Sequence, residues 1–533
     1  MTGVVDVVIV GAGAAGAAVA WRLSELPQLR VVCMEQGEFL DPQKYPSTTP
    51  FWEHAKASTH NPSPNVRSGR FDYPIDDSDS PIGIANYNAV GGSTILFSGH
   101  FPRFHPSDFR VRSLDGVAED WPFSYYDLEP YYKVNDEMMG VSGFSGDPAY
   151  PEIEGMMPPV PLGVMGERIA KGFNQLGWHW WPAYSAINTR GKKGRGACVN
   201  LGPCNTGCAQ GAKSRVDVSY WPAALRNGVE LRTRSRVEKL VFDRAGQLIG
   251  VRYFDGNNVS HFQASRYVIL ACNGVGTPRL LLNSANESFP KGVANSSDMV
   301  GRNLMLHPCG YVEGVFADDL QSDLGPQGCV LLSQEFYESD PSRGYLRGYT
   351  IQALRGPGPL ETAVSGTMRG EIPWGKGFHS AFKSRYNRTA NLAIIAEDLP
   401  DLENRVTLRD DLRDGSGIPA PKVTYRLSDN SRRILSHGLS RGREALLSAG
   451  ALKTTGFGPV RNTGWHLMGT TRMGSDPARS VVDPFGRAHD VMNLSVADSS
   501  VFVTSGAVNP TSTLQAVALR VADGVKSKFF GIL

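Results

Sequence analysis

The stretch VVDVVIVGAGAAGAAVAWRLSEL, at residues 4–26, carries the strongest structural signal in the chain. Its first part, VVDVVIV at 4–10, is a short apolar run that ends at a glycine, as a strand buried on both faces does. The part that follows spaces Ala14, Val19 and Leu23 along one face of a helix. The sequence therefore predicts a strand, a tight turn and a helix in direct succession.

The turn between this strand and helix has the spacing G-x-G-x-x-G, in GAGAAG at residues 11–16. Gly11 allows the tight turn, Gly13 lets the backbone approach a pyrophosphate, and Gly16 lets the helix pack closely on the strand. The first N–H groups of the helix and its dipole would then face the phosphates. The pattern predicts a dinucleotide site and does not separate FAD from NAD; a glycine-rich turn without a ligand is the alternative.

The next apolar run, LRVVCMEQG, reads as a second strand that ends at Glu35. Glu35 lies 24 residues beyond Gly11, where an acidic side chain at the end of the second strand holds a pair of ribose hydroxyls. Its position supports the dinucleotide site.

Composition limits the classes of partner. Hydrophobic residues make up 41% and charged residues 20% of the 533 residues, as in a globular protein. Lys plus Arg number 54 against 52 for Asp plus Glu, so the net charge of +2 gives no reason to expect nucleic acid or an anionic membrane. With no apolar run of about 18 residues and no signal peptide pattern, we expect no membrane span and a cytoplasmic protein that acts on a small molecule.

Three parts are expected along the chain. Residues 1–310 would form a cofactor-binding domain, with an ordered excursion or lid at about 46–82 and some insertions from the second domain. Residues 311–455 would form a substrate-binding domain, and residues 456–533 would return to the first domain. Antiparallel strands are also predicted within 228–255.

Two local signals refine this outline. The strands within 228–255 would be joined by a turn at Arg244 to Gly246, and a long helix is predicted from about Ser428 to Ala449, with Ser428 as its N-cap and Gly450 after it.

Two polar residues near the end of the chain are catalytic candidates. GWHLMGTTRMG at 464–474 contains His466, and Asn509 precedes Pro510 at the start of the last predicted helix. A histidine beside Trp465 is more often a buried core residue than a catalytic one, and Asn509 before Pro510 is typical of a helix N-cap. The residues alone leave both interpretations open.

A series of motifs in fixed order changes this balance, because it resembles the signatures of the glucose-methanol-choline (GMC) flavoprotein oxidoreductases. The motifs are GAGAAG with Glu35, VGGST at 90–94, CNGVGTPRLLLNS at 272–284, VGRNLMLH at 300–307, HLMGTTRMG at 466–474, VVDPFGRAHD at 481–490, and LSVADSS with NPTSTLQAVALR. The resemblance implies an α/β (α+β) fold in which a Rossmann-like FAD-binding domain is interleaved with a substrate domain built on an antiparallel sheet with helices. It also implies that both chain ends fold onto one FAD, which would bring His466 to the flavin.

The same resemblance implies a role for each candidate. His466 would be the base that accepts the hydroxyl proton of an alcohol while a hydride passes to flavin N5, as a neutral imidazole can. Asn509 would orient the alcohol oxygen, because an amide cannot act as a base at pH 7. The first turn of the last helix, near Thr511, would stabilise negative charge on the reduced flavin.

The implied cofactor contacts come from both chain ends. Asp498 resembles the family residue that contacts the flavin chain and phosphates, and Val237 one that flanks the adenine, although a core strand explains Val237 nearly as well. The full set of implied cofactor-binding residues is Gly11, Gly13, Ala15, Gly16, Glu35, Gly91, Gly92, Ser93, Val237, Asp498 and Thr511.

Two further segments, VGGSTILFSGHFPRFHPSDFR and DWPFSYYDLEPYY, resemble the branch with pyranose oxidases, glycoside 3-oxidases and the large subunits of gluconate and other sugar dehydrogenases. The implied reaction is FAD-dependent oxidation of a secondary hydroxyl of a sugar or glycoside to a ketone, with oxygen, a quinone or another electron acceptor. The alternatives are oxidation of another alcohol or a steroid and, less favoured, an FAD-containing lyase. Aromatic residues such as Phe336, Tyr337 and Trp374 would either stack on the substrate or simply pack.

Leu96 and a group of cysteines bear on the cofactors. Some relatives attach flavin to a histidine where this chain has Leu96, so we expect non-covalent FAD. Cys198, Cys204 and Cys208 have the spacing seen in sugar dehydrogenases of this branch that carry an iron-sulfur cluster. The same turn is compatible with three thiols and no iron, and that interpretation is favoured; the identity of any metal stays open.

Overall fold

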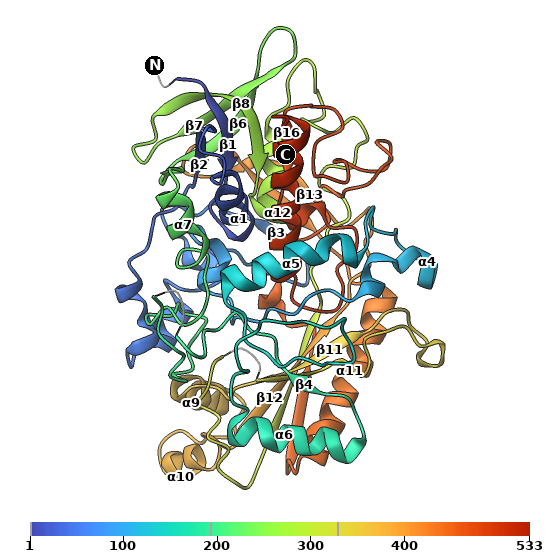
Figure 1. The fold of residues 1–533 in the computed structure, drawn as a ribbon. Helices are drawn as coiled ribbons and strands as arrows, with labels where there is room; N and C mark the ends of the chain where they lie inside the picture. The colour runs from blue at the N-terminus through green and yellow to red at the C-terminus, as the bar shows by residue number, and fades with distance from the viewer. Residues whose placement is uncertain (1–2, 192–193, 328–329, 533) are drawn as a thin grey trace.

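A computed structural model describes residues 3–191, 194–327 and 330–532 of the chain (Figure 1). The N-terminal stretch forms the predicted strand β1 (Val5–Val10), a glycine turn and helix α1 (Ala14–Leu23). Residues Val7 to Ile9 have no exposed surface, so the strand is buried on both faces, as its uninterrupted apolar sequence indicates.

The remaining strands are β2 Val31–Met34, β3 Asp76–Asp79, β4 Trp181–Pro182, β5 Glu230–Arg232, β6 Arg236–Phe242, β7 Leu248–Phe254, β8 Ser260–Leu270, β9 Cys309–Val315, β10 Leu331–Ser333, β11 Tyr349–Leu354, β12 Thr389–Ala396, β13 Arg405–Arg413, β14 Pro419–Thr424, β15 Lys453–Phe457 and β16 Leu494–Val496. The remaining α-helices are α2 Trp52–Ala57, α3 Pro64–Arg67, α4 Val111–Asp115, α5 Tyr125–Met139, α6 Gly163–Leu176, α7 Tyr220–Arg226, α8 Asn273–Asn283, α9 Pro359–Met368, α10 Phe378–Lys383, α11 Asp429–Ser448 and α12 Thr511–Lys528.

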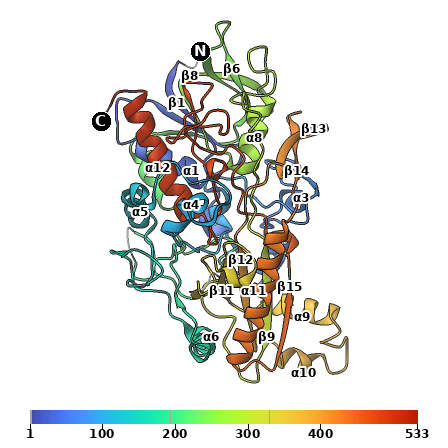
Figure 2. The ribbon, with the colours of Figure 1, turned by 90° about the vertical axis from the view of Figure 1, so that its right-hand side faces the viewer.

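The first sheet has the strand order β5-β2-β1-β8-β7-β6, with β16 also paired to β8. Its central strands are parallel: Val7 of β1 lies opposite Val31 of β2 and Tyr267 of β8. Helix α1 packs against α12, so the first and last helices of the chain lie side by side in both views (Figures 1 and 2). The sheet thus brings the two chain ends together, which a Rossmann-like fold with a returning C-terminus requires.

The second sheet is antiparallel, with the order β15-β9-β12-β11-β10-β4. Helix α11 packs along β9 and β12 on one face of it, and α6 packs on α11 (Figure 2). A buried apolar core that includes Ile351, Ile394 and Leu446 fills the space between the sheet and these helices. This layer matches the expected antiparallel sheet with helices.

The second sheet draws on more of the chain than one continuous block. It takes β4 from before residue 311, while β13 and β14 form a separate small sheet with β3. The division into 1–310, 311–455 and 456–533 therefore stays a prediction. Within the described ranges, no helix is both long and apolar enough to cross a lipid bilayer.

The segment 46–82 contains α2, α3 and β3 with connecting turns, and its expected role as an excursion or lid stays a prediction. Two other local predictions are confirmed. The turn at Arg244 to Gly246 joins the antiparallel strands β6 and β7. Helix α11 begins after Ser428, whose side chain accepts a hydrogen bond from the N–H of Ser431 at 3.0 Å.

Candidate active site

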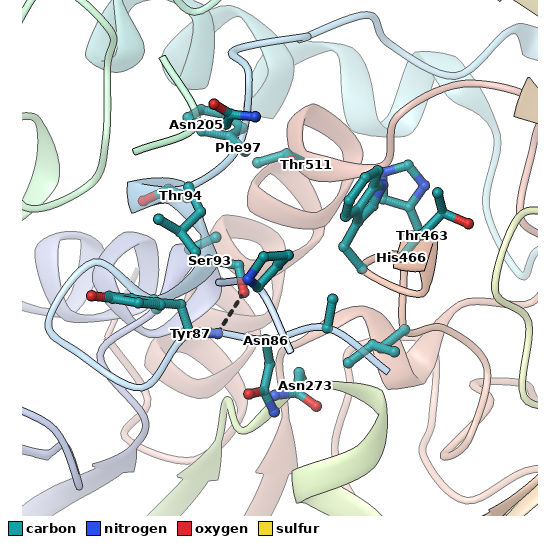
Figure 3. Close-up of a pocket in the computed structure, with 18 of the residues that line it drawn as sticks. Asn86, Tyr87, Ser93, Thr94, Phe97, Asn205, Asn273, Thr463, His466 and Thr511 are labelled. Atoms are coloured by element: carbon teal, nitrogen blue, oxygen red, sulfur yellow. Dashed lines mark hydrogen bonds between the residues drawn. The ribbon is translucent and has the colours of Figure 1, made fainter. Parts of the chain in front are cut away.

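A cavity of about 780 Å³ is lined by residues from the first and second sheets and from both ends of the chain. Figure 3 shows part of its lining, including Ser93, His466 and Thr511. The predicted site residues that line it are Gly11, Gly13, Ala15, Glu35, Gly92, Ser93, Val237, His466, Asp498, Asn509 and Thr511. Gly16 and Gly91 are not among the lining residues. The fold therefore brings together residues that lie nearly 500 positions apart in the sequence.

The first glycine turn is shaped by close backbone contacts. An added Cβ at Gly16 would lie 1.9 Å from the carbonyl oxygen of Gly11, so only glycine lets α1 approach the strand this closely. Gly11 itself has a φ of +102°, which favours glycine. An added Cβ at Gly13 would meet only the Cα of Gly92, at 3.9 Å, so this position faces open space in the cavity. The geometry agrees with the tight turn expected at Gly11 and the close packing expected at Gly16, and the approach of a pyrophosphate to Gly13 stays a prediction.

A second glycine turn forms the neighbouring wall. Gly91 donates its N–H to the carbonyl of Ala12 at 3.0 Å, and an added Cβ at Gly92 would lie 2.9 Å from the Cα of Gly13. The hydroxyl of Ser93 accepts a hydrogen bond from the N–H of Tyr87 at 3.3 Å (Figure 3). The two turns thus pack directly on each other without intervening side chains.

The Glu35 carboxylate fixes the end of β2. Its two oxygens accept hydrogen bonds from the N–H groups of Ala12 at 2.9 Å and Gly37 at 2.8 Å. Burial raises the pKa of Glu35, and these two hydrogen bonds act in the opposite direction. The Glu35 carbonyl accepts the N–H of Ser235 at 2.8 Å, which brings Val237 on β6 to the same end of the cavity.

The Asp498 carboxylate joins segments that are distant in sequence. It accepts hydrogen bonds from the hydroxyl of Thr277 at 2.5 Å and from the N–H groups of Asn273 at 3.1 Å and Ser500 at 2.9 Å. Burial raises its pKa. Asp498 therefore holds the start of α8 against the segment that follows β16, at the wall of the cavity.

His466 lies in a chain of hydrogen bonds that fixes which of its nitrogens carries a proton. Nε2 of His307 lies 2.7 Å from the carbonyl of Gly506, which can only accept, so this nitrogen donates. Burial lowers the pKa of His307 to about 4, so His307 is neutral and its Nδ1 is an acceptor. Nδ1 of His466 lies 2.9 Å from that acceptor and must carry the proton. In a neutral His466, Nε2 therefore carries no proton and can accept one.

Asn509 and Gln352 continue this chain on the other side of His466. Gln352 donates its side-chain N–H to Oδ1 of Asn509 at 2.5 Å, which directs Nδ2 of Asn509 toward Nε2 of His466 at 3.5 Å. Asn509 does not cap the last helix, so the alternative interpretation of this residue as an N-cap is wrong. Helix α12 begins one residue later than predicted, at Thr511, with Pro510 at the N-cap position and no side-chain cap.

Burial keeps the histidines of this site uncharged. The pKa of His466 lies well below its usual value of 6.5, first because of burial and then because of the nearby His307 and His100. Burial also lowers the pKa of His100, another lining residue, to about 4. At pH 7 the site therefore offers a neutral imidazole that can accept a proton.

Sequence reasoning missed His307 and Gln352. His307 ends the VGRNLMLH motif, which supports the resemblance to the family but implied no role for the histidine. Gln352 lies on β11 in no recognised motif, and only the fold shows its contact with Asn509. The motif position of His307 was the one signal that could have identified it.

The cavity suits a large cofactor with phosphates and polar rings. Side-chain oxygens of Asn86 and Asn205 are buried and, among the described residues, lack a hydrogen-bond partner, and both residues line the cavity (Figure 3). The Cβ-free surface at Gly13 and the uncapped start of α12 supply backbone N–H groups of the kind that bind phosphate or a negative ring edge. These features fit FAD.

Cys198, Cys204 and Cys208 are all free thiols, and among the described residues no group of three or more His, Cys, Asp or Glu side chains is placed to hold a metal ion. The sulfur of Cys204 instead accepts the N–H of Gln327 at 3.3 Å.

The aromatic residues suggested for substrate stacking do not line the cavity. Phe336 stacks on Tyr349, the hydroxyl of Tyr337 donates to Asp108 at 2.7 Å, and Trp374 is 89% exposed. Phe336 and Tyr337 therefore pack within the protein, as the alternative interpretation expects, and Trp374 faces solvent.

Two curated proteins are similar to nearly the whole chain or most of it. The 2-methyl-1,2-propanediol dehydrogenase of Mycolicibacterium austroafricanum is 38% identical over 535 residues, which covers 99% of this chain and 96% of that protein. The fructose dehydrogenase large subunit of Gluconobacter japonicus is 31% identical over 445 residues, covering 82% of this chain and 80% of that protein.

Solved structures and family models agree with these relatives. The crystal structure of pyridoxine 4-oxidase from Mesorbium loti superposes with a TM-score of 0.69 at 19% identity and covers 98% of this chain and 99% of that chain, which shows a shared fold. Two family models described as GMC oxidoreductase match residues 5–309 and 400–518. Because the first of these models alone spans more than half of its length, this chain belongs to the GMC oxidoreductase family.

Proposed function

We propose that this GMC oxidoreductase uses FAD to oxidise a secondary hydroxyl of a sugar or glycoside to a ketone. The observation that carries the proposal is that His466, with an unprotonated Nε2, and Asn509 lie side by side. They share one cavity with the glycine turn at residues 11–16. Oxidation of an alcohol needs a base for the hydroxyl proton beside an acceptor for the hydride, and this cavity supports both.

The side chains handle the proton and the orientation of the alcohol. The alcohol oxygen would lie against both Nε2 of His466 and Nδ2 of Asn509, which are 3.5 Å apart. It would accept a hydrogen bond from the Asn509 amide and donate its own proton to His466, which is neutral before the reaction. Bound FAD supplies the two-electron acceptor for the hydride. Gln352 keeps the Asn509 amide in the required orientation.

The cofactor would be held by both chain ends. Gly11, Gly13, Ala15, Gly92 and Ser93 would bind the phosphates and the adjoining chain, with Gly16 and Gly91 acting through the packing of the two turns. Glu35 and Val237 would bind the adenosine end, Asp498 the region of the flavin chain, and the start of α12 at Thr511 the flavin ring. Because Leu96 stands at the position of the linking histidine, the FAD would be non-covalent.

The sugar class rests on two supports. The fructose dehydrogenase large subunit is similar over 82% of this chain. The face of the second sheet that lines the cavity also carries polar side chains, Glu313, Gln352 and Asn391, which suit a substrate with several hydroxyls. The electron acceptor would be oxygen, a quinone or another carrier.

A small diol is the second candidate substrate. The 2-methyl-1,2-propanediol dehydrogenase is the more similar of the two relatives, at 38% identity over 99% of this chain. The same His466 and Asn509 pair would serve either substrate, because it contacts only the reacting hydroxyl.

Anaerobic mixing of the holoenzyme with candidate alcohols tests this proposal. Monosaccharides and glycosides should bleach the flavin absorbance faster than 2-methyl-1,2-propanediol does. The reverse order would favour the diol, and the absence of bleaching with any alcohol would favour a lyase. We propose that no iron is bound, so metal analysis that finds about three iron atoms per chain would restore the cluster interpretation.

A further inference from the structure

Arg355 carries a buried charge on the cavity wall. It directly follows β11 and lines the cavity with only 5% of its surface exposed. Its Nε and Nη1 are buried and, within the described part of the chain, have no hydrogen-bond partner. Buried guanidinium N–H groups without acceptors are costly, so this arrangement calls for a ligand group.

The other buried charged residues on the cavity wall are already satisfied. Glu35 and Asp498 accept backbone hydrogen bonds, as described above. Arg236 and Arg279 form ion pairs with Asp414 at 3.3 Å and 2.8 Å. Among the described residues, Arg355 is therefore the one buried charged lining residue with neither an ion pair nor a hydrogen bond from its charged group.

The surroundings of Arg355 are built to hold its guanidinium in place. An added Cβ at Gly202 would lie 1.8 Å from Nη1, so this glycine makes room for the group. The Trp52 ring, which also lines the cavity, has its centre 5.7 Å from the central guanidinium carbon. Asn205, in the same loop as Gly202, adds a buried side-chain oxygen that lacks a partner among the described residues. The site thus offers fixed donors and a nearby acceptor.

The position of Arg355 separates it from the reacting hydroxyl. Gln352, which contacts Asn509, precedes it by three residues, or about 10 Å along an extended chain. A ligand that reaches both places must carry its anionic group several carbons away from the oxidised hydroxyl.

The charges around Arg355 favour a ligand with a single negative charge, because the carboxylates of Asp323 and Glu53 also act on this guanidinium and would repel a more highly charged anion. Two other cations that line the cavity already have partners, since Lys56 lies 3.6 Å from Glu361 and Arg369 lies 3.5 Å from Glu313. One unpaired guanidinium matches a carboxylate, whose two oxygens fit its fork of donors, better than a phosphate with nearly two charges.

We propose that Arg355 binds the carboxylate of an acidic sugar, such as a hexuronic acid or its glycoside, and so determines substrate specificity. This inference rests on the proposed function for the reacting end of the sugar. The binding of the carboxylate itself depends only on Arg355 and its surroundings.

Isothermal titration of the holoenzyme compares methyl β-D-glucuronide with methyl β-D-glucoside, which differ in the carboxylate. A His466→Ala background slows turnover during the measurement. We expect the glucuronide to bind at least about tenfold more tightly, and Arg355→Gln to weaken its binding on the order of 10- to 100-fold while the glucoside is unaffected. Arg369→Gln, which removes a paired arginine of the same cavity, should leave the difference between the two ligands intact.

Several results would overturn the inference. Equal affinity of the unsubstituted cavity for the two glycosides would do so without any Arg355 variant. An equal loss of affinity for both glycosides in Arg355→Gln would also overturn it, as would loss of FAD from this variant. So would tighter binding of glucose 6-phosphate than of the glucuronide. If neither glycoside reduces the flavin but the glucuronide still binds through Arg355, the proposed oxidation fails while this inference stands.

Discussion

At the scale of single residues, His466 is able to accept a proton only through Nε2, because its Nδ1 donates to His307. Removing the imidazole should slow flavin reduction by about 10²- to 10⁴-fold, the usual contribution of a general base, while FAD stays bound. Stopped-flow reduction of His466→Ala by the best substrate measures this. An unchanged rate in a fully loaded variant would remove His466 from the role of base.

His307 is expected to act on the reaction only through His466. Its acceptor Nδ1 and its donor Nε2 select the reactive tautomer of His466, so His307→Leu should slow flavin reduction by about tenfold or more, the scale of a lost buried hydrogen bond. His307→Gln offers one acceptor and one donor and should recover part of the rate. A merely structural role predicts equal rates in the two variants once their stabilities are matched.

The lowered pKa of His466 has a consequence for the pH dependence of the reaction. The base works when it is deprotonated, and burial moves its pKa well below 6.5. The rate of flavin reduction should therefore stay flat from neutral pH down through pH 6.5 and fall only at lower pH. A midpoint near 6.5 in the wild type would show instead that His466 is solvated like an ordinary histidine.

At the scale of elements, two glycines of the strand-turn-helix unit differ in the space around them: Gly16 is closely packed, and Gly13 faces the cavity. Gly16→Ala places a Cβ 1.9 Å from a backbone oxygen, so α1 must shift and the fold should lose about 1–3 kcal/mol. Gly13→Ala meets no atom closer than 3.9 Å and should leave the stability of the apoprotein nearly unchanged while it weakens FAD binding. Thermal unfolding of both apoproteins and FAD titration separate the two effects, and identical behaviour of the two variants would contradict the assignment.

The difference between these glycines also marks what the sequence could predict. The βα unit, the β6–β7 turn and the cap of α11 depend on neighbouring residues, so their patterns were sufficient. The contacts of Gln352 and Arg355 depend on how β11 lies against loops from elsewhere in the chain, and no local pattern contains that information. For the same reason the residues alone could not separate a capping role of Asn509 from a catalytic one, because its contact with Gln352 arises only in the fold.

At the scale of the whole molecule, the lining of the cavity is complete only when both chain ends are in place. Arg22 of α1 pairs with Asp523 of α12 at 2.8 Å, and the indole N–H of Trp121 donates to the hydroxyl of Thr504 at 2.7 Å. Such contacts tie the last segment to the first domain across almost the full length of the chain. The cofactor site should therefore form and unfold together with the fold as a whole.

Binding of FAD should then stabilise the entire molecule. At a free FAD concentration about 100 times its dissociation constant, the holoenzyme should gain about 2.7 kcal/mol, because FAD binds the folded state and not the unfolded one. We expect a single unfolding transition in circular dichroism that coincides with the rise of flavin fluorescence as FAD is released. His466→Ala should show the same gain in stability and Gly13→Ala a smaller one. Of these two positions, Gly13 is the one on the surface expected to contact the phosphates. Release of FAD well below the main transition would mean that the C-terminal segment separates before the rest unfolds, and that the two chain ends are less tightly coupled than their contacts indicate.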